Sequence, residues 1–547
     1  MLRVAGKTTI ALHRIAYLIY NYEKEFRPDE FMIIAPTKFF LNYISNILPD
    51  LGVNDVKQYT FEDFAYDVIG KRLKISDSNE KLVMIVNNEI DDDYKEKVDI
   101  ILQESKLKSS IKFKKIIDEY LKYIELNFIP KEDFYFNEYK IMDYKDINEL
   151  FLNVYKMYNF TMRINEIEKN LVYEFRKKSE EIIKNLKEKR SKAVEGLEGK
   201  NRIETYEEYE KIIKLVEKDY KKIVKNYLKK IQTKNCIDYY MDFIENYLND
   251  VENSENKSDV LKNQNSEFNE VIKYLRKSTL ANMKKNEVTF EDLAPIMYLQ
   301  YKILGIKEKA RVKHVVIDEA QDYGEFQFDV LKTILNSNSM TILGDIAQGV
   351  HYYRGIENWQ RFIDIEFDDV NVTYTTLQKT YRTTKDIMNI ANSVINKLPE
   401  YEKEFIVLGD PVIDRKDSIN IQKQNNIKEL TEAINYRINT YLKNNYKSIA
   451  IIGKDINECK ELERQLSKLR NDVKLIQGKD SEYNAGISIV PSYLAKGLEF
   501  DCVIIANANK EKYSNSSLDT KLLYVTITRA MSKLDVFYMG EISDLLK

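Results

Sequence analysis

The sequence has few of the residues that bind zinc. Among its 547 residues there are only three cysteines and three histidines. Cys236, Cys459 and Cys502 lie far apart and form no CxxC pair, so we expect no zinc site. The histidines are His13, His314 and His351. This cysteine usage suits a reducing compartment.

Long apolar runs and a strong net charge are also missing. No stretch reaches the roughly 20 apolar residues that a membrane helix needs, and the N-terminus has no cleavage-like site. Lys and Arg number 85 against 88 Asp and Glu, a formal charge of -3, so no field over the whole chain points to nucleic acid. A local basic groove stays open. We expect a cytoplasmic protein with no membrane partner.

The rest of the composition is that of a folded chain with several domains. Hydrophobic residues make up 44% of the sequence, and 547 residues are too many for one core. Short apolar runs alternate with helical stretches in residues 1–65 and again from about residue 286. The runs are FMIIAPT (31–37), VKHVVID (312–318), MTILGD (340–345), KSIAIIG (447–453), GISIVPS (486–492) and FDCVIIA (500–506). This pattern predicts an α/β fold with parallel sheets, whose ligands bind at the carboxyl ends of the strands.

Residues from about 66 to 285 have a different character, with abundant Lys, Glu, Asn and Tyr and almost no Gly or Pro. Two stripes of apolar residues recur there at three- or four-residue steps, the period of a helix. The stripes are Ile164, Ile167, Leu171, Phe175, Ile182 and Leu186, then Ile203, Tyr206, Tyr209, Ile213, Val216, Tyr220, Ile223 and Tyr227. Gly196 and Gly199 separate them, which predicts a long antiparallel hairpin. We favour mutual packing of the helices over a partner surface. Residues 250–268 are polar and predict a loop.

The stretch HVVIDEAQD (314–322) is the most informative one. A buried strand ends there in two adjacent carboxylates, Asp318 and Glu319, and a charge at the end of a buried strand needs a reason. Neighbouring side chains at a strand end diverge, so one carboxylate can hold Mg²⁺ while the other orients a water. Nucleoside triphosphate hydrolysis divides its work in this way.

The start of the chain contains a partner for these carboxylates, the tripeptide Gly6-Lys7-Thr8. In a phosphate-binding loop, backbone N–H groups and a helix N-terminus bind phosphate oxygens, while Lys neutralises charge and Thr ligates Mg²⁺. The tripeptide alone is weak evidence. Together with the carboxylate-ended strand it favours nucleotide binding.

Eight stretches follow the order found in superfamily 1 helicases of the UvrD/Rep type. They are AGKTTIALHRIAYLIY, IIAPTKFFLNYISNILPDLG, YTFEDFA, VVIDEAQDYGEFQ, MTILGDIAQGVHYYRGI, LQKTYRTTKDIMNIAN, VPSYLAKGLEFDCVII and KLLYVTITRA. The chain resembles this family, and within it most resembles the HelD group of RNA-polymerase-associated, helicase-like ATPases. The resemblance implies two RecA-like P-loop NTPase motor domains, one from residues 1–65 and 286–375 and one from 376–547. Residues 66–285 would then be a large helical insertion in the first motor domain.

The same resemblance implies a role for individual residues at a site for ATP and Mg²⁺. It assigns phosphate binding to Gly6, Lys7, Thr8 and Thr9, and metal binding to Thr8 and Asp318. Glu319 would activate water, Gln348 would sense the γ-phosphate, and Arg382 and Arg529 would contact it. Tyr381 would stack on the adenine and Glu499 would bind the ribose. Arginines that reach the γ-phosphate stabilise transition-state charge. Because the nucleotide would lie between two domains, its hydrolysis would change how they are held together.

The resemblance also implies a track for single-stranded nucleic acid, lined by Thr37, Thr60, Phe61, Tyr353 and Tyr493. Aromatic rings on such a track stack on bases. The alternative is that these rings pack between strands and helices. Tyr493 stands where active helicases have His, and Tyr353 stands where they have Trp. Only about 110 residues separate YRTT from KGLEF, which leaves little room for the insertion of unwinding enzymes, so we do not expect processive unwinding.

The start of the chain departs from the family pattern GxAGSGKTT, because it has RVAGKTT. Two loop residues and the first glycine are absent, as are the preceding strand, the coiled coil and the adenine-reading region. Each lost charge-assisted hydrogen bond would weaken phosphate binding by roughly 1.5–3 kcal/mol. We therefore expect an N-terminally truncated Walker A loop, from either a truncated gene or a misassigned start.

The sequence therefore predicts ATP hydrolysis that drives movement on single-stranded DNA, in the 3′-to-5′ direction that the resemblance implies. One alternative is a HelD-like factor that binds and recycles RNA polymerase without unwinding DNA. Another is an inactive remnant. A generic P-loop kinase or transporter ATPase would leave QKTYRTT and TITRA unexplained.

Overall fold

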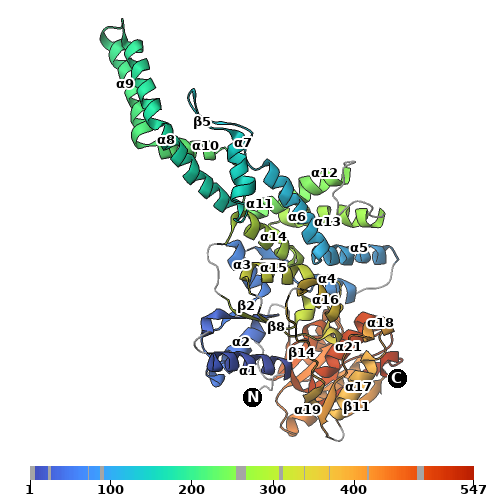
Figure 1. The fold of residues 1–547 in the computed structure, drawn as a ribbon. Coiled ribbons are helices and arrows are strands. Elements are labelled where there is room, and N and C mark those ends of the chain that lie inside the picture. The colour runs from blue at the N-terminus through green and yellow to red at the C-terminus, as the bar shows by residue number, and fades with distance from the viewer. Residues whose placement is uncertain are drawn as a thin grey trace.

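The computed structural model of the protein describes residues 6–22, 26–71, 73–86, 92–253, 266–306, 312–337, 339–368, 370–415, 418–476 and 486–547. Two parallel sheets lie side by side at one end of the molecule, and helices extend from the first of them (Figure 1). This mixed α/β architecture confirms the predicted fold class.

The first sheet has four parallel strands in the order β2-β1-β7-β8. They are β2 (Lys57–Thr60), β1 (Phe31–Ala35), β7 (His314–Ile317) and β8 (Met340–Ile342). Every residue of β1 and β7 is buried, as expected for the centre of a parallel sheet covered on both faces. The helix α1 (Gly6–Asn21) covers one face, where Leu12 and Ile15 join the cluster of Phe31 and Val316. On the other face α3 (Phe61–Ile69) packs over Ile34.

The second sheet has six parallel strands in the order β11-β16-β15-β12-β14-β13. They are β11 (Ile419–Gln424), β16 (Ala530–Met539), β15 (Phe500–Ile505), β12 (Ile449–Gly453), β14 (Ile487–Pro491) and β13 (Val473–Leu475). Two helices on each face bury the apolar side chains of the strands. These are α17 (Lys385–Ile395) and α21 (Ser517–Thr528) on one face, and α19 (Ile427–Lys443) and α20 (Ile456–Leu466) on the other. All six apolar runs singled out in the sequence form strands of one sheet or the other.

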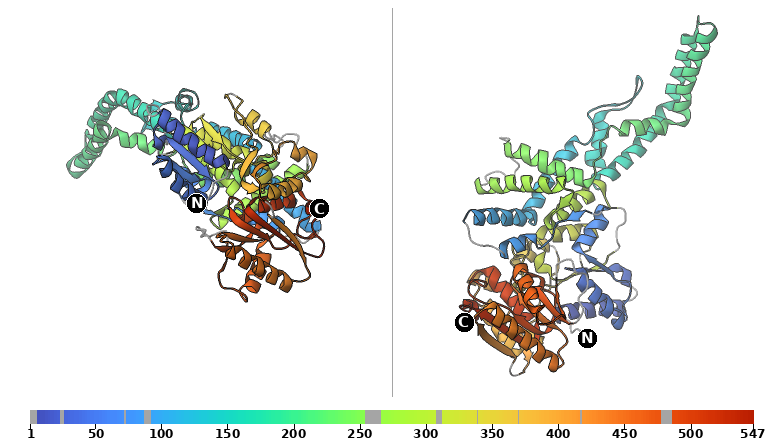
Figure 2. Two further views of the ribbon diagram at one scale, coloured as in Figure 1. Left: turned by 90° about the horizontal axis from the view of Figure 1, so that it is seen from below. Right: turned by 180° about the vertical axis from the view of Figure 1, so that it is seen from behind.

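A helical arm projects away from both sheets (Figures 1 and 2). It consists of α8 (Phe160–Val194) and α9 (Gly199–Lys218), which lie side by side, followed by α10 (Tyr220–Leu228). Gly196 and Gly199 take positive φ angles in the connection between α8 and α9. The second stripe is interrupted at Asp219, and its first members Ile203 and Tyr206 are exposed.

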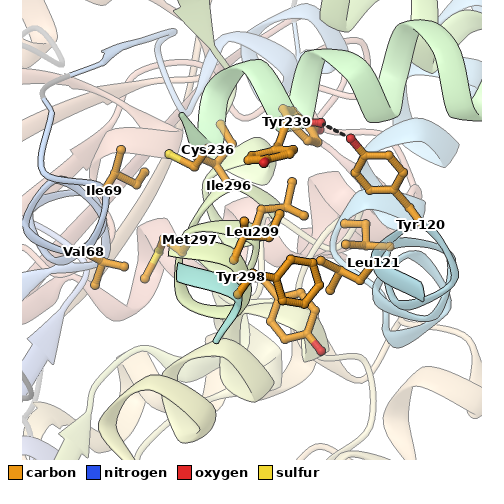
Figure 3. Packing of buried hydrophobic residues seen from close by; sticks show 14 of the residues in the cluster. Val68, Ile69, Tyr120, Leu121, Cys236, Tyr239, Ile296, Met297, Tyr298 and Leu299 are labelled. Atoms are coloured by element: carbon orange, nitrogen blue, oxygen red, sulfur yellow. Dashed lines mark hydrogen bonds between the residues drawn. The ribbon is translucent and has the colours of Figure 1, made fainter. Parts of the chain in front are cut away.

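The base of the arm is held by a buried helix, α14 (Leu293–Leu299), whose seven residues are all buried. A helix that is apolar on every side must be enclosed by other elements. Figure 3 shows this helix among side chains of α3, α6 (Ile111–Asn127) and α11 (Cys236–Asp242). The hydroxyl of Tyr120 donates to the Tyr239 carbonyl over 3.0 Å in the same place. The apolar core of the first sheet thus continues into the helical part without a break.

The predicted loop at residues 250–268 is corrected at its two ends, and its middle part lies outside the described residues. Helices α12 (Leu248–Asn253) and α13 (Ser266–Lys284) extend into the segment 250–268 from both sides, so its ends are helical rather than loop, because apolar side chains of α13 such as Val271 and Leu275 pack into the core. Residues 254–265 lie outside the described residues. Within the described ranges, none of the helices combines the length and apolar character needed to cross a bilayer.

Candidate functional site

Charged side chains gather at the carboxyl ends of β7 and β8, the edge at which parallel α/β sheets bind ligands. Asp318 directly follows β7 and is buried, and its carboxylate accepts a hydrogen bond from the Glu319 amide over 2.9 Å. Glu319 has a φ of 51°, in the left-handed region, which costs a non-glycine residue about 1–3 kcal/mol. Strain of this kind is found where a side chain is held in place for function.

The Glu319 carboxylate is held in its ionised form. Gln321 donates to it over 2.6 Å, and the Lys496 ammonium lies 3.3 Å away. Burial opposes the charge, but Lys496, Gln321 and Arg529 together lower the pKa of Glu319 to about 2. At neutral pH this group is therefore a carboxylate that can accept a hydrogen bond from water.

Lys496 reaches this cluster from the second sheet, where it follows β14 by five residues. Its nearly buried ammonium also lies 2.6 Å from a carboxylate oxygen of Asp322. Burial would lower the pKa of Lys496, but the two carboxylates raise it. Lys496 was not among the predicted site residues, although it lies in the motif stretch YLAKGLEF.

Asp345, three residues after β8, is a second site residue that was not predicted from the sequence. Its carboxylate lies 3.1 Å from the Lys7 ammonium and accepts from Gln348 over 2.8 Å. Lys7 extends from the first turn of α1 and also donates to the Gly344 carbonyl over 3.2 Å. Lys7 and Gln348, predicted from distant motifs, thus meet on one carboxylate.

Gln348 also contacts the second sheet. Arg529, which ends α21, donates from Nη2 to Gln348 Oε1 over 2.7 Å. The Arg529 side chain is 1% exposed. Burial, followed by repulsion from Arg382, lowers the pKa of Arg529 to about 9. Two guanidinium groups are therefore close together in a place with little water.

Arg382 completes this cationic group. Its guanidinium lies 2.8 Å from a Glu499 carboxylate oxygen, and both Arg382 and Arg529 donate to the Leu498 carbonyl, over 3.2 and 3.3 Å. Arg382 Nε and Glu499 Oε2 are buried and have no hydrogen-bond partner among the described residues. Tyr381, beside Arg382, is 63% exposed and so has a free ring face.

The structure brings most of the predicted nucleotide residues together. Lys7, Asp318, Glu319, Gln348, Arg382, Glu499 and Arg529 belong to one cluster, and Gly6, Thr8 and Thr9 lie in the first turn of α1 beside it. The cluster fits a polyanion, because an added anion would give Arg382 Nε a partner and relieve the repulsion that lowers the pKa of Arg529. The shortened loop before Gly6 falls on residues outside the described part, so its effect stays a prediction.

The residues expected on the single-strand track have other roles in this structure. The hydroxyls of Thr37 and Thr60 cap α2 (Lys38–Ile47) and α3 by accepting from backbone amides. Phe61 is 1% exposed and packs against Phe290 and Tyr323, with ring centroids 5.5 and 5.7 Å apart. Phe61 therefore has no free face for a base.

Tyr353 and Tyr493 are also covered. Tyr353 is 2% exposed and its hydroxyl lies 3.0 Å from His351 Nδ1, while Tyr493 is 7% exposed. Both rings belong to the apolar cluster on one face of the second sheet. In this structure the rings of Phe61, Tyr353 and Tyr493 therefore pack between other side chains, which is the alternative to base stacking. These rings could stack on bases only if the side chains that cover them moved.

Two parallel α/β units with cations and carboxylates gathered between them suit a polyanionic ligand such as a nucleotide. The family description "UvrD/REP helicase N-terminal domain" matches residues 5–364, and "UvrD-like helicase C-terminal domain" matches residues 486–536. The chain belongs to the UvrD/REP helicase family.

Two relatives found by sequence are named as DNA helicases. The chain is 31% identical over 226 residues to a probable DNA helicase II homolog of Mycoplasma capricolum, covering 38% of this chain and 29% of that protein. It is 26% identical over 318 residues to the ATP-dependent DNA helicase Rep of Buchnera aphidicola subsp. Acyrthosiphon pisum, covering 56% and 46%. The matches thus span less than half the length of these relatives. A crystal structure of the C-terminal domain of a possible DNA helicase from Lactobacillus plantarum is 30% identical, with 30% of this chain and 91% of that chain covered and a TM-score of 0.25.

Proposed function

We propose that the protein is an ATP hydrolase of the DNA helicase type, which couples ATP hydrolysis to movement along single-stranded DNA. The observation that carries this proposal is the contact of Gln348 with both Asp345 and Arg529. Through this side chain, the end of β8 in one sheet is joined to the end of α21 over the other. A ligand that binds at this point would alter the contact between the two units.

The chain supplies the groups that ATP hydrolysis needs. Lys7, Arg382 and Arg529 would neutralise the phosphates, and the Glu319 carboxylate would orient and deprotonate the attacking water. Asp318 and Thr8 would hold Mg²⁺, which supplies neutralisation of phosphate charge when it is bound. The exposed ring of Tyr381 would stack on the adenine, and Glu499 would bind the ribose.

The choice of single-stranded DNA as the track rests on family membership and on relatives that are named as DNA helicases. The 3′-to-5′ direction is part of the proposal. The HelD-like alternative, in which RNA polymerase is the partner, stays a prediction that the comparisons do not favour over DNA. The contacts between the predicted catalytic residues give no reason to prefer an inactive remnant.

Steady-state ATPase activity tests the proposal. We expect Mg²⁺-dependent hydrolysis that increases with oligo-dT and falls at least about 100-fold in Glu319→Gln, which keeps the size of the side chain but cannot act as a base. Glu461→Gln is a matched control, because this glutamate lies on the exposed face of α20 and pairs with Arg464 and Gln465 of the same helix. Equal activity in the wild type and Glu319→Gln would contradict the proposal. ATPase activity that ignores DNA but responds to RNA polymerase would favour the alternative partner.

A further inference from the structure

The helical arm, which projects away from both sheets in Figures 1 and 2, has one strongly basic segment at the end of α9 and along α10. Residues 211–234 contain nine lysines and only two acidic residues, in a chain whose net charge is -3. The nine lysines, all of which are exposed, are Lys211, Lys214, Lys218, Lys221, Lys222, Lys225, Lys229, Lys230 and Lys234. The balanced charge of the whole chain therefore conceals a local basic patch.

Five of these lysines follow one another at alternating three- and four-residue steps, which places them along one side of a helix. This lysine stripe consists of Lys211, Lys214, Lys218, Lys221 and Lys225. It spans roughly 21 Å of helix, and α10 begins directly after Asp219, where α9 ends. Ile213 and Val216 of α9 and Val224 of α10 are buried in the core of the arm. The two helices thus turn their apolar sides inward and the lysine stripe outward.

The charges of the lysine stripe are not neutralised by the protein itself. Within the described part of the chain, none of its five ammonium groups pairs with a carboxylate, whereas the neighbouring Lys222 lies 3.2 Å from Asp219. Earlier in α9 the two signs of charge are mixed, and Lys200 lies 3.5 Å from Glu204. An exposed face that serves only solubility mixes the signs in this way. A row of unpaired cations instead favours a polyanionic partner.

The aromatic side chains of this segment are used inside the arm. Tyr220 stacks on Phe175 with ring centroids 6.2 Å apart, and Tyr227 packs against Phe134 at 4.7 Å. The lysine stripe therefore offers cations for phosphates but no ring for an unpaired base. Double-stranded DNA fits such a surface, because its bases are already stacked and each strand presents a phosphate per roughly 3.4 Å of axis.

We propose that the lysine stripe binds the phosphate backbone of double-stranded DNA without regard to base sequence. This inference goes beyond the proposed function, because the stripe lies on the arm and its binding requires neither ATP nor the carboxylates at the end of β7. Each lysine that contacts a phosphate releases a counterion from the DNA, so the binding weakens steeply as salt is added. An acidic protein surface is the other partner with suitable charge, and the tests below separate it from DNA.

The first test removes the charges in the variant Lys211→Gln/Lys214→Gln/Lys218→Gln/Lys221→Gln/Lys225→Gln. We expect a fluorescein-labelled blunt duplex of about 20 base pairs to bind at least about tenfold more weakly at roughly 50 mM salt, measured by fluorescence anisotropy. The slope of log K against log salt concentration should also become shallower by at least about 2. The matched control has Lys→Gln at five exposed lysines around the second sheet, namely Lys423, Lys428, Lys443, Lys460 and Lys468. Equal losses of duplex binding in the two variants, or no loss in either, would overturn the proposal.

The second test keeps the charge and changes the cation. Arginine also binds phosphate oxygens, so Lys→Arg at the same five positions should bind the duplex within about twofold of the wild type. Circular dichroism checks that both stripe variants keep the fold. A loss of duplex binding in the arginine variant as large as in the glutamine variant would overturn the proposal, because the charge would then not be the cause.

The remaining outcomes separate this surface from the nucleotide site and from a protein partner. We expect the glutamine variant to keep the ATPase activity of the wild type and its increase with oligo-dT. Loss of that increase with unchanged duplex binding would overturn the proposal, because the lysines would then belong to a single-strand track. Binding of RNA polymerase but not of the duplex through the stripe would overturn it in favour of an acidic protein surface. ATPase activity that is lost in Glu319→Gln would support the nucleotide site in either case, and stripe-dependent duplex binding without any ATPase activity would support the stripe alone.

Discussion

Arg529 donates to Gln348 over 2.7 Å, and this hydrogen bond joins residues 181 positions apart in the chain. Gln348 is in turn bonded to Asp345, the carboxylate that also pairs with Lys7. A γ-phosphate placed among these groups would compete for the Lys7 ammonium and the Arg529 guanidinium. We therefore expect the contact between the two sheets to depend on the state of the nucleotide.

The first prediction concerns the geometry of Arg529. In Arg529→Lys the positive charge is retained but the planar fork that reaches Gln348 and Leu498 is lost. We expect kcat for ATP hydrolysis to fall on the order of 10³-fold, the range found for arginines that contact the γ-phosphate. Arg464→Lys is the control, since Arg464 is exposed and pairs with Glu461 within its own helix. Similar kcat values for the two variants would exclude a role for Arg529 in the transition state.

The second prediction concerns alkaline pH. Burial and Arg382 lower the pKa of Arg529 to about 9, so its charge is present below this pH and is lost as the pH rises through it. We expect kcat/KM, which reports the free enzyme, to decline above pH about 9. Bound ATP is an anion and raises this pKa, so the decline of kcat should lie at higher pH. Circular dichroism over the same range checks that the fold persists, and identical profiles for kcat and kcat/KM would contradict the prediction.

The third prediction concerns Lys496, which lies between Glu319 and Asp322. Lys496→Met leaves two carboxylates close together without their cation. We expect the free energy of unfolding in urea to fall by about 3–5 kcal/mol, as for other broken buried ion pairs. ATPase activity should also fall, because the pKa of Glu319 would rise. Adding Asp322→Asn should restore part of the stability, and Lys468→Met on the surface should have little effect. No rescue by the second substitution would argue against charge as the cause.

The fourth prediction separates the arm from the nucleotide site. The Arg163 guanidinium, at the start of α8, donates to the carbonyls of Phe151, Lys156 and Tyr158 and pairs with Glu125. Lysine cannot reach all of these acceptors, and each buried carbonyl left without a partner costs about 1–3 kcal/mol. We expect Arg163→Lys to speed hydrogen exchange at the base of the arm while ATPase activity without DNA is retained. The exposed Arg176 provides the matched control, as Arg176→Lys. A loss of ATPase activity in Arg163→Lys alone would show that the arm base supports the catalytic site.

Apolar runs allowed the strands at the centre of each sheet to be predicted, because a strand covered on both faces needs continuous hydrophobic residues. The strand β16 was not predicted, because its sequence AMSKLDVFYM has charged residues among the apolar ones. Of its charged residues, Asp535 is fully buried and pairs with Arg437 of α19, a partner that no local pattern reveals. Strands of this kind depend on contacts made far away in the sequence.

The residues of the candidate site could likewise be predicted only in part from the sequence. Lys7, Glu319, Gln348, Arg382 and Arg529 could be predicted because each belongs to a motif of recognisable residues. Lys496, Asp345 and Gln321 lie in the same motifs but were not predicted, because their function in the site is to bond to other side chains, which only the folded chain brings close.

Burial was the least predictable property. Phe61, Tyr353 and Tyr493 lie in motifs expected to face nucleic acid, yet all three are covered. Tyr353 and Tyr493 share an apolar cluster with Leu82 and Val86, which are more than 250 residues away in sequence. The packing of such a distant segment leaves no signal in the motifs themselves.

We expect ATP to bind between the two α/β units and to contact residues of both. Isothermal titration calorimetry with MgATP measures this binding, in the Glu319→Gln background so that hydrolysis does not interfere. We expect Lys7→Ala, in α1 over the first sheet, and Arg382→Ala, in β9 (Lys379–Thr384) beside the second, each to weaken ATP binding at least about tenfold, as expected for a lost charge-assisted contact. Exposed Lys468→Ala should not change it. Binding that is weakened by only one of the two site variants, or no binding at all, would contradict a shared site.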